Sequence, residues 1–468
     1  MELKKLYDTI VEFAIECGLD PKTNSNLKGN AIIRDNASEK QNDREGFLKG
    51  AYFGFIRDDE EYSGAFHDFS LVIFPQIDNK ACVVALGIGS LGFLNDYDIA
   101  SLPWVRRMFS KLRKEGRKTY FKNDFSDIES SSLDLMTEIK NNYPDLKKVI
   151  DTYKKVLPAA EILDFSDEKN DVDNINTMKQ WVATYALMRN WPNKSQLKKV
   201  KEYLPKPQRK ILEINDIFGI LVNEHYIVLQ GAPGTGKTFS ALEVAKNFDK
   251  VFFEQFHAET TFSDFIYGIR PMLNNDSLAY EKKEGVLLEA IKYAKKNSND
   301  KVLLIIDEIN RANLSNVLGP VFYLFEKNAS NHSYSFNVGN EELEDMPENL
   351  YVIATMNTAD RSLAVVDFAL RRRFTWLTLR PHALKNDFQN DYFEDFDNIF
   401  QKYASDDELN LQPGQSYFIA KDETEMKQRL EYELLPLIKE YIYEGYLVKA
   451  KDEFCNYFYN KLGVLMYE

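Results

Sequence analysis

Residues 226–248 read YIVLQGAPGTGKTFSALEVAKNF and combine an apolar run, a glycine-rich turn and a lysine–threonine pair. Glycines let backbone N–H groups converge on phosphate oxygens, and a helix that begins at Lys237 adds the positive end of its dipole. The Lys237 amine would reach the β- and γ-phosphates, and the Thr238 hydroxyl would bind Mg²⁺. The spacing Gly-x-x-x-x-Gly-Lys-Thr therefore predicts a nucleoside-triphosphate site, built from Gly231, Ala232, Pro233, Gly234, Thr235, Gly236, Lys237 and Thr238.

A second apolar run, VLLII at residues 302–306, ends in the carboxylate pair Asp307–Glu308. A carboxylate at the end of a parallel strand beside a phosphate loop can order the water around Mg²⁺, and the next carboxylate can orient the attacking water. We assign Asp307 to the metal, through water, and Glu308 to the attacking water. Such a pair is also typical of a solvated strand end, but its position after the glycine-rich turn favours the catalytic interpretation.

A third apolar run, LYVIATM at residues 350–356, ends in Asn357, and three consecutive arginines follow at 371–373. Asn357 can lie beside the γ-phosphate and help to hold the water, although asparagine is also a common turn residue. The arginines are too far along the chain to fold back easily onto the same phosphate. An arginine that stabilises a transferring phosphoryl group can come from a neighbouring subunit, which predicts a ring. A solvated or ion-paired helix end is the alternative.

The order of predicted strands, loops and helices indicates how these residues are positioned. From His225 onward, strand, loop and helix alternate, which favours a parallel sheet with helices on both faces. The region after Arg380 is mostly helical, and Asp164–Thr177 is acidic, polar and without an apolar period, as in a linker. We expect an α/β or α+β domain at 1–163, a linker and helical segment at 164–206, an α/β nucleotide-binding subdomain at 207–380 and a helical subdomain at 381–468.

Composition restricts the class of protein. With 468 residues the chain is too long for one ordinary core, and 44% hydrophobic and 28% charged residues are typical of a globular protein. The net charge of −14 excludes a chain coated in positive potential. The three scattered cysteines favour a reducing compartment. Since the N-terminus lacks a signal-peptide core and no run of ~18 apolar residues occurs, we expect a cytoplasmic protein without a membrane partner.

Four segments together carry a family resemblance: GAPGTGKT, FEQFHAETTFSDFIYGIRPM, LLIIDEINRANLSNVLGPVFYLFEKN and MNTADRSLAVVDFALRRRF. They resemble the AAA+ domain of McrB, the motor subunit of modification-dependent restriction systems. The later QPGQSYF and LLPLIKEYI segments are similar to the helical lid of that family, so the resemblance covers about residues 207–445. It does not extend to the N-terminal part of the chain.

The resemblance implies a hexameric, GTP-hydrolysing, Mg²⁺-dependent ring that moves along DNA and works with an McrC-like nuclease subunit. In this family Asn357 and Asp360 match the polar pair of the MNTADRS signature, and Arg372 and Arg373 match the arginines that act on the neighbouring subunit. The chain departs from other AAA+ proteins and GTPases in two respects. Its lid has no segment that matches a second-sensor arginine, and it has no Asn-Lys-x-Asp motif to select guanine, so ATP stays an alternative substrate.

The N-terminal part holds the densest basic cluster of this acidic chain, interleaved with aromatic residues. Such a cluster can bind phosphates, and the aromatic rings can stack on bases. The alternative is an amphipathic helix whose charges face water. By analogy with the varied N-terminal domains of McrB relatives, we expect this domain to recognise DNA, with a modified base as one option. The candidate DNA-binding residues are Arg106, Arg107, Lys111, Arg113, Lys114, Arg117 and Lys118.

The preferred interpretation is a McrB-like AAA+ GTPase that forms a ring and drives DNA translocation for a separate nuclease in anti-phage restriction. No nuclease constellation is found in this sequence. One alternative is an ATP-hydrolysing remodeller of proteins similar to the MoxR group. Another is a nucleotide-gated sensor or scaffold in a defence system, although the set Lys237, Glu308 and Asn357 favours hydrolysis.

Overall fold

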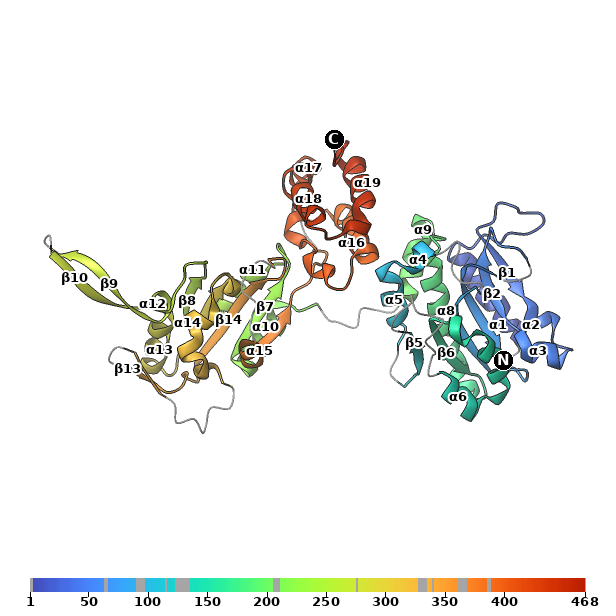
Figure 1. Cartoon of the computed structure of the whole chain (residues 1–468), viewed down its shortest axis with the longest axis horizontal. Coiled ribbons are helices and arrows are strands. Elements are labelled where there is room, and N and C mark those ends of the chain that lie inside the picture. Colours follow the sequence, from blue (N-terminus) through green and yellow to red (C-terminus); the bar gives the residue numbers. More distant parts are fainter. Residues whose placement is uncertain are drawn as a thin grey trace. The chain divides into compact units, whose positions relative to one another are not determined.

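The computed structural model describes residues 3–62, 66–89, 97–113, 116–122, 135–204, 211–274, 277–326, 335–338, 341–360, 368–384 and 389–467 (Figure 1). The chain divides into two compact units, residues 1–209 and 210–468. Within the described residues no helix is both long enough and apolar enough to cross a membrane.

A six-stranded sheet forms the centre of the first unit. Its strand order is β1-β2-β3-β4-β6-β5, and every pair of neighbours is antiparallel. The first unit is therefore an α+β domain. The strands are β1 (Ala31–Asp35), β2 (Phe53–Arg57), β3 (Phe69–Pro75), β4 (Ala81–Ile88), β5 (Thr119–Phe121) and β6 (Ala159–Asp164).

Helices cover both faces of this sheet because alternate strand residues point to opposite sides. Leu71 and Val84 share a core with α1, α5 and α8, whereas Val72 and Val83 share a second core with α6 and α7. The helices of this unit are α1 (Leu3–Glu16), α2 (Asn36–Glu39), α3 (Arg44–Gly50), α4 (Tyr97–Ala100), α5 (Pro103–Ser110), α6 (Leu135–Asn142), α7 (Lys147–Tyr153), α8 (Asp171–Met188) and α9 (Lys194–Tyr203).

The segment 164–206 differs from the linker expected from its composition. Its described part, up to Leu204, contains α8 and α9, and α8 lies in the core of the first unit. Trp181 on α8 is fully buried and donates to Glu161 on β6, 3.1 Å away. The Tyr185 hydroxyl donates to the Phe69 carbonyl at 2.8 Å. The acidic start of this segment is therefore the exposed beginning of a core helix.

The second unit is built on a five-stranded sheet with the order β15-β7-β14-β11-β8, and all of its strand pairs are parallel. Parallel sheets are buried on both faces. One face packs against α10 and α11, and the opposite face packs against α12, α13 and α14. The strands are β7 (Tyr226–Gly231), β8 (Lys250–Gln255), β11 (Val302–Asp307), β14 (Leu350–Asn357) and β15 (Thr375–Thr378). This arrangement confirms the predicted parallel sheet with helices on both faces.

Two antiparallel hairpins and the remaining helices complete this part of the second unit. The hairpins are β9 (Tyr267–Asn274) with β10 (Ser277–Glu284), and β12 (Phe336–Val338) with β13 (Glu341–Leu343). The helices are α10 (Ile214–Glu224), α11 (Lys237–Ala245), α12 (Phe262–Phe265), α13 (Val286–Lys296), α14 (Leu314–Leu318) and α15 (Phe368–Arg373).

The C-terminal region is helical and has its own apolar core, which includes Phe396, Phe400, Phe418 and Phe454. The predicted helical subdomain is therefore confirmed as a helical region. Its main helices are α16 (Asn390–Tyr403), α17 (Glu423–Arg429), α18 (Leu435–Tyr443) and α19 (Lys451–Leu462).

Candidate functional site

Three neighbouring strands of the parallel sheet end in the residues that the sequence analysis selected. β7 runs into the phosphate loop at Gly231, β11 ends at Asp307, and β14 ends at Asn357. In the register of the sheet Asn357 pairs with Gly231, and Ile306 pairs with Ala354. Since all three strands are parallel, their carboxyl ends lie at one edge of the sheet, where ligands of open α/β folds bind.

The phosphate loop, residues 231–238, has the conformation that its glycines allow. Gly234 and Gly236 have φ values of +77° and +84°, in the left-handed region that glycine adopts without strain. The Thr235 hydroxyl donates to the Ala232 carbonyl at 2.9 Å and holds the turn. Helix α11 begins directly after Gly236, so the first N–H groups of that helix lie at the loop.

Lys237 lies in a largely desolvated position at the start of α11. Its amine donates to the carbonyl oxygens of Gly231 and Ala232, at 3.0 and 2.8 Å. Burial lowers the pKa of Lys237 to about 8, against the opposing influence of the carboxylates of Glu308 and Asp307. The amine is therefore held at the loop by neutral acceptors, which a more strongly accepting phosphate can replace.

Asp307 is buried and receives two hydroxyl donors on the same carboxylate oxygen, Oδ1. The Thr238 hydroxyl donates to it at 2.8 Å and the Thr355 hydroxyl at 2.6 Å. A threonine hydroxyl and a carboxylate side by side are the protein groups that Mg²⁺ uses when phosphates and water supply its other ligands. Within the described ranges no three His, Cys, Asp or Glu side chains are grouped so that they could hold a metal by themselves. The donor set therefore fits Mg²⁺ bound together with a phosphate.

Glu308 is held in a conformation that is unusual for a residue with a side chain. Its φ is +54°, in the left-handed region, and its N–H donates to the Thr355 hydroxyl at 3.0 Å. Backbone strain of this kind occurs where the surrounding structure fixes it, often at functional sites. The carboxylate forms an ion pair with Arg311, and Arg311 also lies 3.4 Å from Asp360. The four groups Glu308, Arg311, Thr355 and Asp360 form a connected polar network at the strand ends.

Two members of this network, Thr355 and Arg311, were missed by the sequence analysis. Thr355 lies two residues before Asn357 in the same strand, so both side chains point to the same face of the sheet. The two-residue spacing could therefore have identified Thr355 as a residue of the site. Arg311 follows Glu308 by three residues, at the end of a 3₁₀ turn that begins directly after Glu308.

Asn357 lies at the end of β14 and stabilises the turn that follows. Its side-chain oxygen accepts from the Ala359 N–H at 3.1 Å, and its backbone carbonyl accepts from the Asn310 side chain at 3.3 Å. The next N–H, of Thr358, donates to the Gly231 carbonyl at 3.0 Å. Asn357 therefore forms a turn beside the phosphate loop, and its contact with the attacking water stays a prediction.

The arginines Arg372 and Arg373 end α15 and differ in exposure. Arg373 is 8% exposed, and its guanidinium lies 2.5 Å from the Glu326 carboxylate and over the Phe322 ring. The Arg372 side chain is 66% exposed and contacts the same carboxylate at 2.8 Å. Both arginines thus contact Glu326, but the Arg372 side chain lies at the surface, whereas Arg373 is buried.

Comparisons with known proteins agree with this geometry. Residues 226–374 match the family model described as AAA domain (dynein-related subfamily). The type IV methyl-directed restriction enzyme EcoKMcrB subunit of Escherichia coli K12 is 41% identical, over 38% of this chain and 40% of the relative. Residues 226–374 are therefore an AAA domain, in a chain that is similar to the McrB subunit.

A second relative is the type II restriction enzyme BsuMI component YdiS of Bacillus subtilis 168. It is 29% identical, over 32% of this chain and 55% of the relative. This chain therefore spans about half the length of the curated relatives that it matches. A solved structure, a putative ATPase from Cytophaga hutchinsonii ATCC 33406, covers 47% of this chain at 20% identity and a TM-score of 0.27.

Outside the AAA+ domain, the basic cluster of the first unit divides into surface and structural residues. Arg106, Lys111 and Arg113 are exposed, Arg107 is half-buried, and Lys114 lies outside the described residues. The Arg113 guanidinium lies 4.8 Å from the centre of the Phe121 ring. The exposed residues come from α5 and the turn that follows it, so they remain candidates for contact with phosphates.

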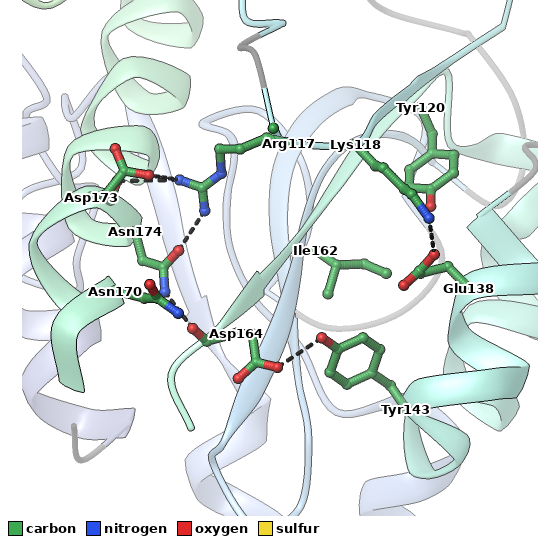
Figure 2. A pocket seen from close by; sticks show the side chains of 11 residues that line it. Arg117, Lys118, Tyr120, Glu138, Tyr143, Ile162, Asp164, Asn170, Asp173 and Asn174 are labelled. Carbon is green, nitrogen blue, oxygen red and sulfur yellow. Dashed lines mark hydrogen bonds and ion pairs between the residues drawn. The ribbon is translucent and has the colours of Figure 1, made fainter. Parts of the chain in front are cut away.

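Arg117 and Lys118 line a polar cavity of about 490 Å³ at the β5 edge of the first sheet, shown in Figure 2. The Arg117 guanidinium is 3.0 Å from the Glu161 carboxylate and 2.5 Å from that of Asp173. Glu161 is almost fully buried, so Arg117 is the counter-ion of a buried acid. Lys118 is paired with Glu138 at 2.6 Å, and the interaction raises the pKa of Lys118. Both cations therefore have a structural use within the fold.

Proposed function

We propose that this chain is the NTP-hydrolysing motor subunit of a restriction system, with GTP as its preferred substrate and DNA as its track. The proposal also includes a ring of subunits, an McrC-like nuclease partner and DNA recognition by the first unit. The observation that carries it is the alignment of Gly231, Asp307 and Asn357 at one sheet edge, with the Thr238 hydroxyl on Asp307. Both relatives are components of restriction enzymes, which supports the restriction context.

Each group has a defined task in this proposal. The phosphate loop binds the β- and γ-phosphates through backbone N–H groups, and Lys237 exchanges its two carbonyl partners for phosphate oxygens. Thr238, together with Asp307 through water, would hold Mg²⁺, which would neutralise charge on the phosphates. Glu308 orients the attacking water, and Asn357 holds that water from the adjacent strand end.

Ring formation enters the proposal through the arginines. Arg372 is exposed at the end of α15 and can stabilise charge on a phosphoryl group held by the next subunit. Arg373 supports that position through its pair with Glu326 and joins the neighbouring site only when this pair opens.

Asp360 can draw Arg311 away from Glu308, because Arg311 contacts both carboxylates.

The first experiment measures steady-state hydrolysis of GTP and ATP side by side, each with and without DNA and with the product of the adjacent gene. We expect guanine preference and stimulation by the partner. Glu308→Gln is the control: it should keep nucleotide binding and lower hydrolysis by ~10² or more. Adenine preference without any effect of DNA or partner would contradict the restriction motor and favour a remodelling protein. Unchanged turnover in Glu308→Gln would remove Glu308 from its assigned task.

A further inference from the structure

A loop of the helical C-terminal region contacts the phosphate loop directly. The Gly414 N–H donates to the Pro233 carbonyl at 2.8 Å, and the Ser416 N–H donates to the Gly234 carbonyl at 3.1 Å. A Cβ atom at Gly414 would lie 2.1 Å from the Gly234 carbonyl carbon, so only glycine allows this approach. The two loops are therefore joined backbone to backbone.

Gln415, between these two residues, adds a side-chain contact. Its Nε2 donates to the Thr235 carbonyl at 3.0 Å, and the residue is only 7% exposed. Its Oε1 is buried and has no hydrogen-bond partner among the described residues. The amide orientation follows from Thr235, because a carbonyl can only accept and must face the NH₂ group. A buried acceptor without a donor is unfavourable and calls for an explanation.

A nearby glutamine, Gln412, provides a comparison because both ends of its side-chain amide form hydrogen bonds within the protein. Gln412 is equally buried, but its Nε2 donates to Asp397 at 2.8 Å and its Oε1 accepts from Gln401 at 3.4 Å. Both ends of Gln412 are thus used within the helical region. Gln415 differs because one end is bonded to the phosphate loop and the other end has no protein donor.

We propose that the Gln415 Oε1 accepts a hydrogen bond from the nucleoside part of the bound nucleotide, which makes Gln415 a specificity-determining residue of the site. This inference rests on the proposed function, since it assumes that a nucleotide occupies the phosphate loop. The phosphate groups of a nucleotide are ionised near neutral pH and offer acceptors rather than donors. Among the groups of the nucleotide itself, only a ribose hydroxyl or an N–H group of the base can donate to Oε1. Gln415 then links the helical C-terminal region to the nucleoside without a charge.

The test compares wild type, Gln415→Leu and the matched control Gln412→Leu by calorimetric binding of diphosphates, which are not hydrolysed at this site. The ligands are GDP and ADP, their 2′-deoxy and 3′-deoxy forms, and IDP. Gln415→Leu should weaken binding about three- to tenfold, as for one hydrogen bond. Gln412→Leu should bind as wild type does. Thermal unfolding of each variant monitors the fold.

The decisive result comes from the analogue that lacks the donor. That analogue should bind wild type and Gln415→Leu equally well, and it identifies the donor: a deoxy form implicates the sugar, whereas IDP or the other purine implicates the base. An equal loss for every ligand would show that the amide only holds Thr235 and would overturn the inference. No loss for any ligand would overturn it as well. If Gln415→Leu is unstable, Gln415→Met, which keeps the length of the side chain but has no amide, is compared with wild type in the same titrations. A wild-type chain that binds neither GDP nor ADP would overturn the proposed function together with this inference.

Discussion

The Lys237 amine illustrates how burial prepares a single residue for an anionic ligand. The amine donates to neutral carbonyls, and burial lowers its pKa to about 8. A bound triphosphate would place negative charge beside the amine and would raise its pKa. Protonation of Lys237 and nucleotide binding are therefore coupled, because each favours the other.

This coupling predicts a pH dependence of nucleotide affinity. Below about pH 8 Lys237 is already charged and contributes no slope. Above about pH 8 the free chain loses the proton that the complex keeps, so affinity should fall by up to about tenfold per pH unit. The stability of the free chain changes in the opposite direction: because the folded pKa is lowered, unfolding takes up a proton above about pH 8, and stability rises with pH there. Calorimetric titrations with GDP across this range measure the effect. Lys237→Met should remove the slope, and a flat affinity in wild type would contradict the prediction.

For single residues, the sequence analysis selected those that belong to short motifs and missed the side chains that form hydrogen bonds or ion pairs with them. The phosphate loop, Asp307, Glu308 and Asn357 follow from short motifs whose chemistry depends on residue type and order. Thr355 and Arg311 belong to the same site, but their contacts depend on strand register and on the left-handed backbone at Glu308. Neither feature has a local sequence signature.

At the scale of secondary structure, α8 shows why composition misled the prediction of a linker. Its first turn is acidic and exposed, and its later residues are buried on most sides, so no clean helical period is visible. The acidic residue Asp173 is paired with Arg117, which lies 56 residues earlier in the chain. A pairing over that distance cannot be read from local composition. By contrast, the alternation of strands and helices after His225 predicted the parallel sheet correctly.

Two arginines of the basic cluster, Arg117 and Arg113, are expected to differ in their effects on stability and on DNA binding. Arg117→Met should leave the buried Glu161 carboxylate without its cation and destabilise the chain by about 3–5 kcal/mol, as for a broken buried pair. Arg113→Met should keep its stability, since Arg113 is exposed, but weaken DNA binding and reduce its salt dependence. Denaturant unfolding and DNA titrations at several salt concentrations distinguish the two. Restored stability in the double variant Arg117→Met, Glu161→Gln would support the assignment of Arg117 as counter-ion. A stable Arg117→Met chain with lost DNA binding would reverse the two roles.

At the scale of the whole molecule, the exposed Arg372 leads to a test of shared active sites. Glu308→Gln subunits and Arg372→Ala subunits should each be inactive in hydrolysis. Mixed together they should recover part of the activity, because an intact Glu308 can then meet an intact Arg372 across an interface. The measurement is hydrolysis as a function of mixing ratio, with assembly followed by light scattering. If mixed assemblies form and no ratio restores hydrolysis, Arg372 does not act on a neighbouring subunit. Arg373→Ala is the less informative partner, since it also breaks a buried contact with Glu326.

The core of the first unit includes α8 and α9, and this has a consequence for transplanting target choice between relatives. The part of the chain that would have to be transferred as one piece ends after residue 204 rather than at residue 163. A chimera joined at residue 163 would lack the native α8, and with it the hydrogen bonds of Trp181 to Glu161 and of Tyr185 to Phe69. The core of its first unit would therefore be incomplete. A chimera joined between residues 204 and 211 would carry the whole core of the first unit onto another AAA domain.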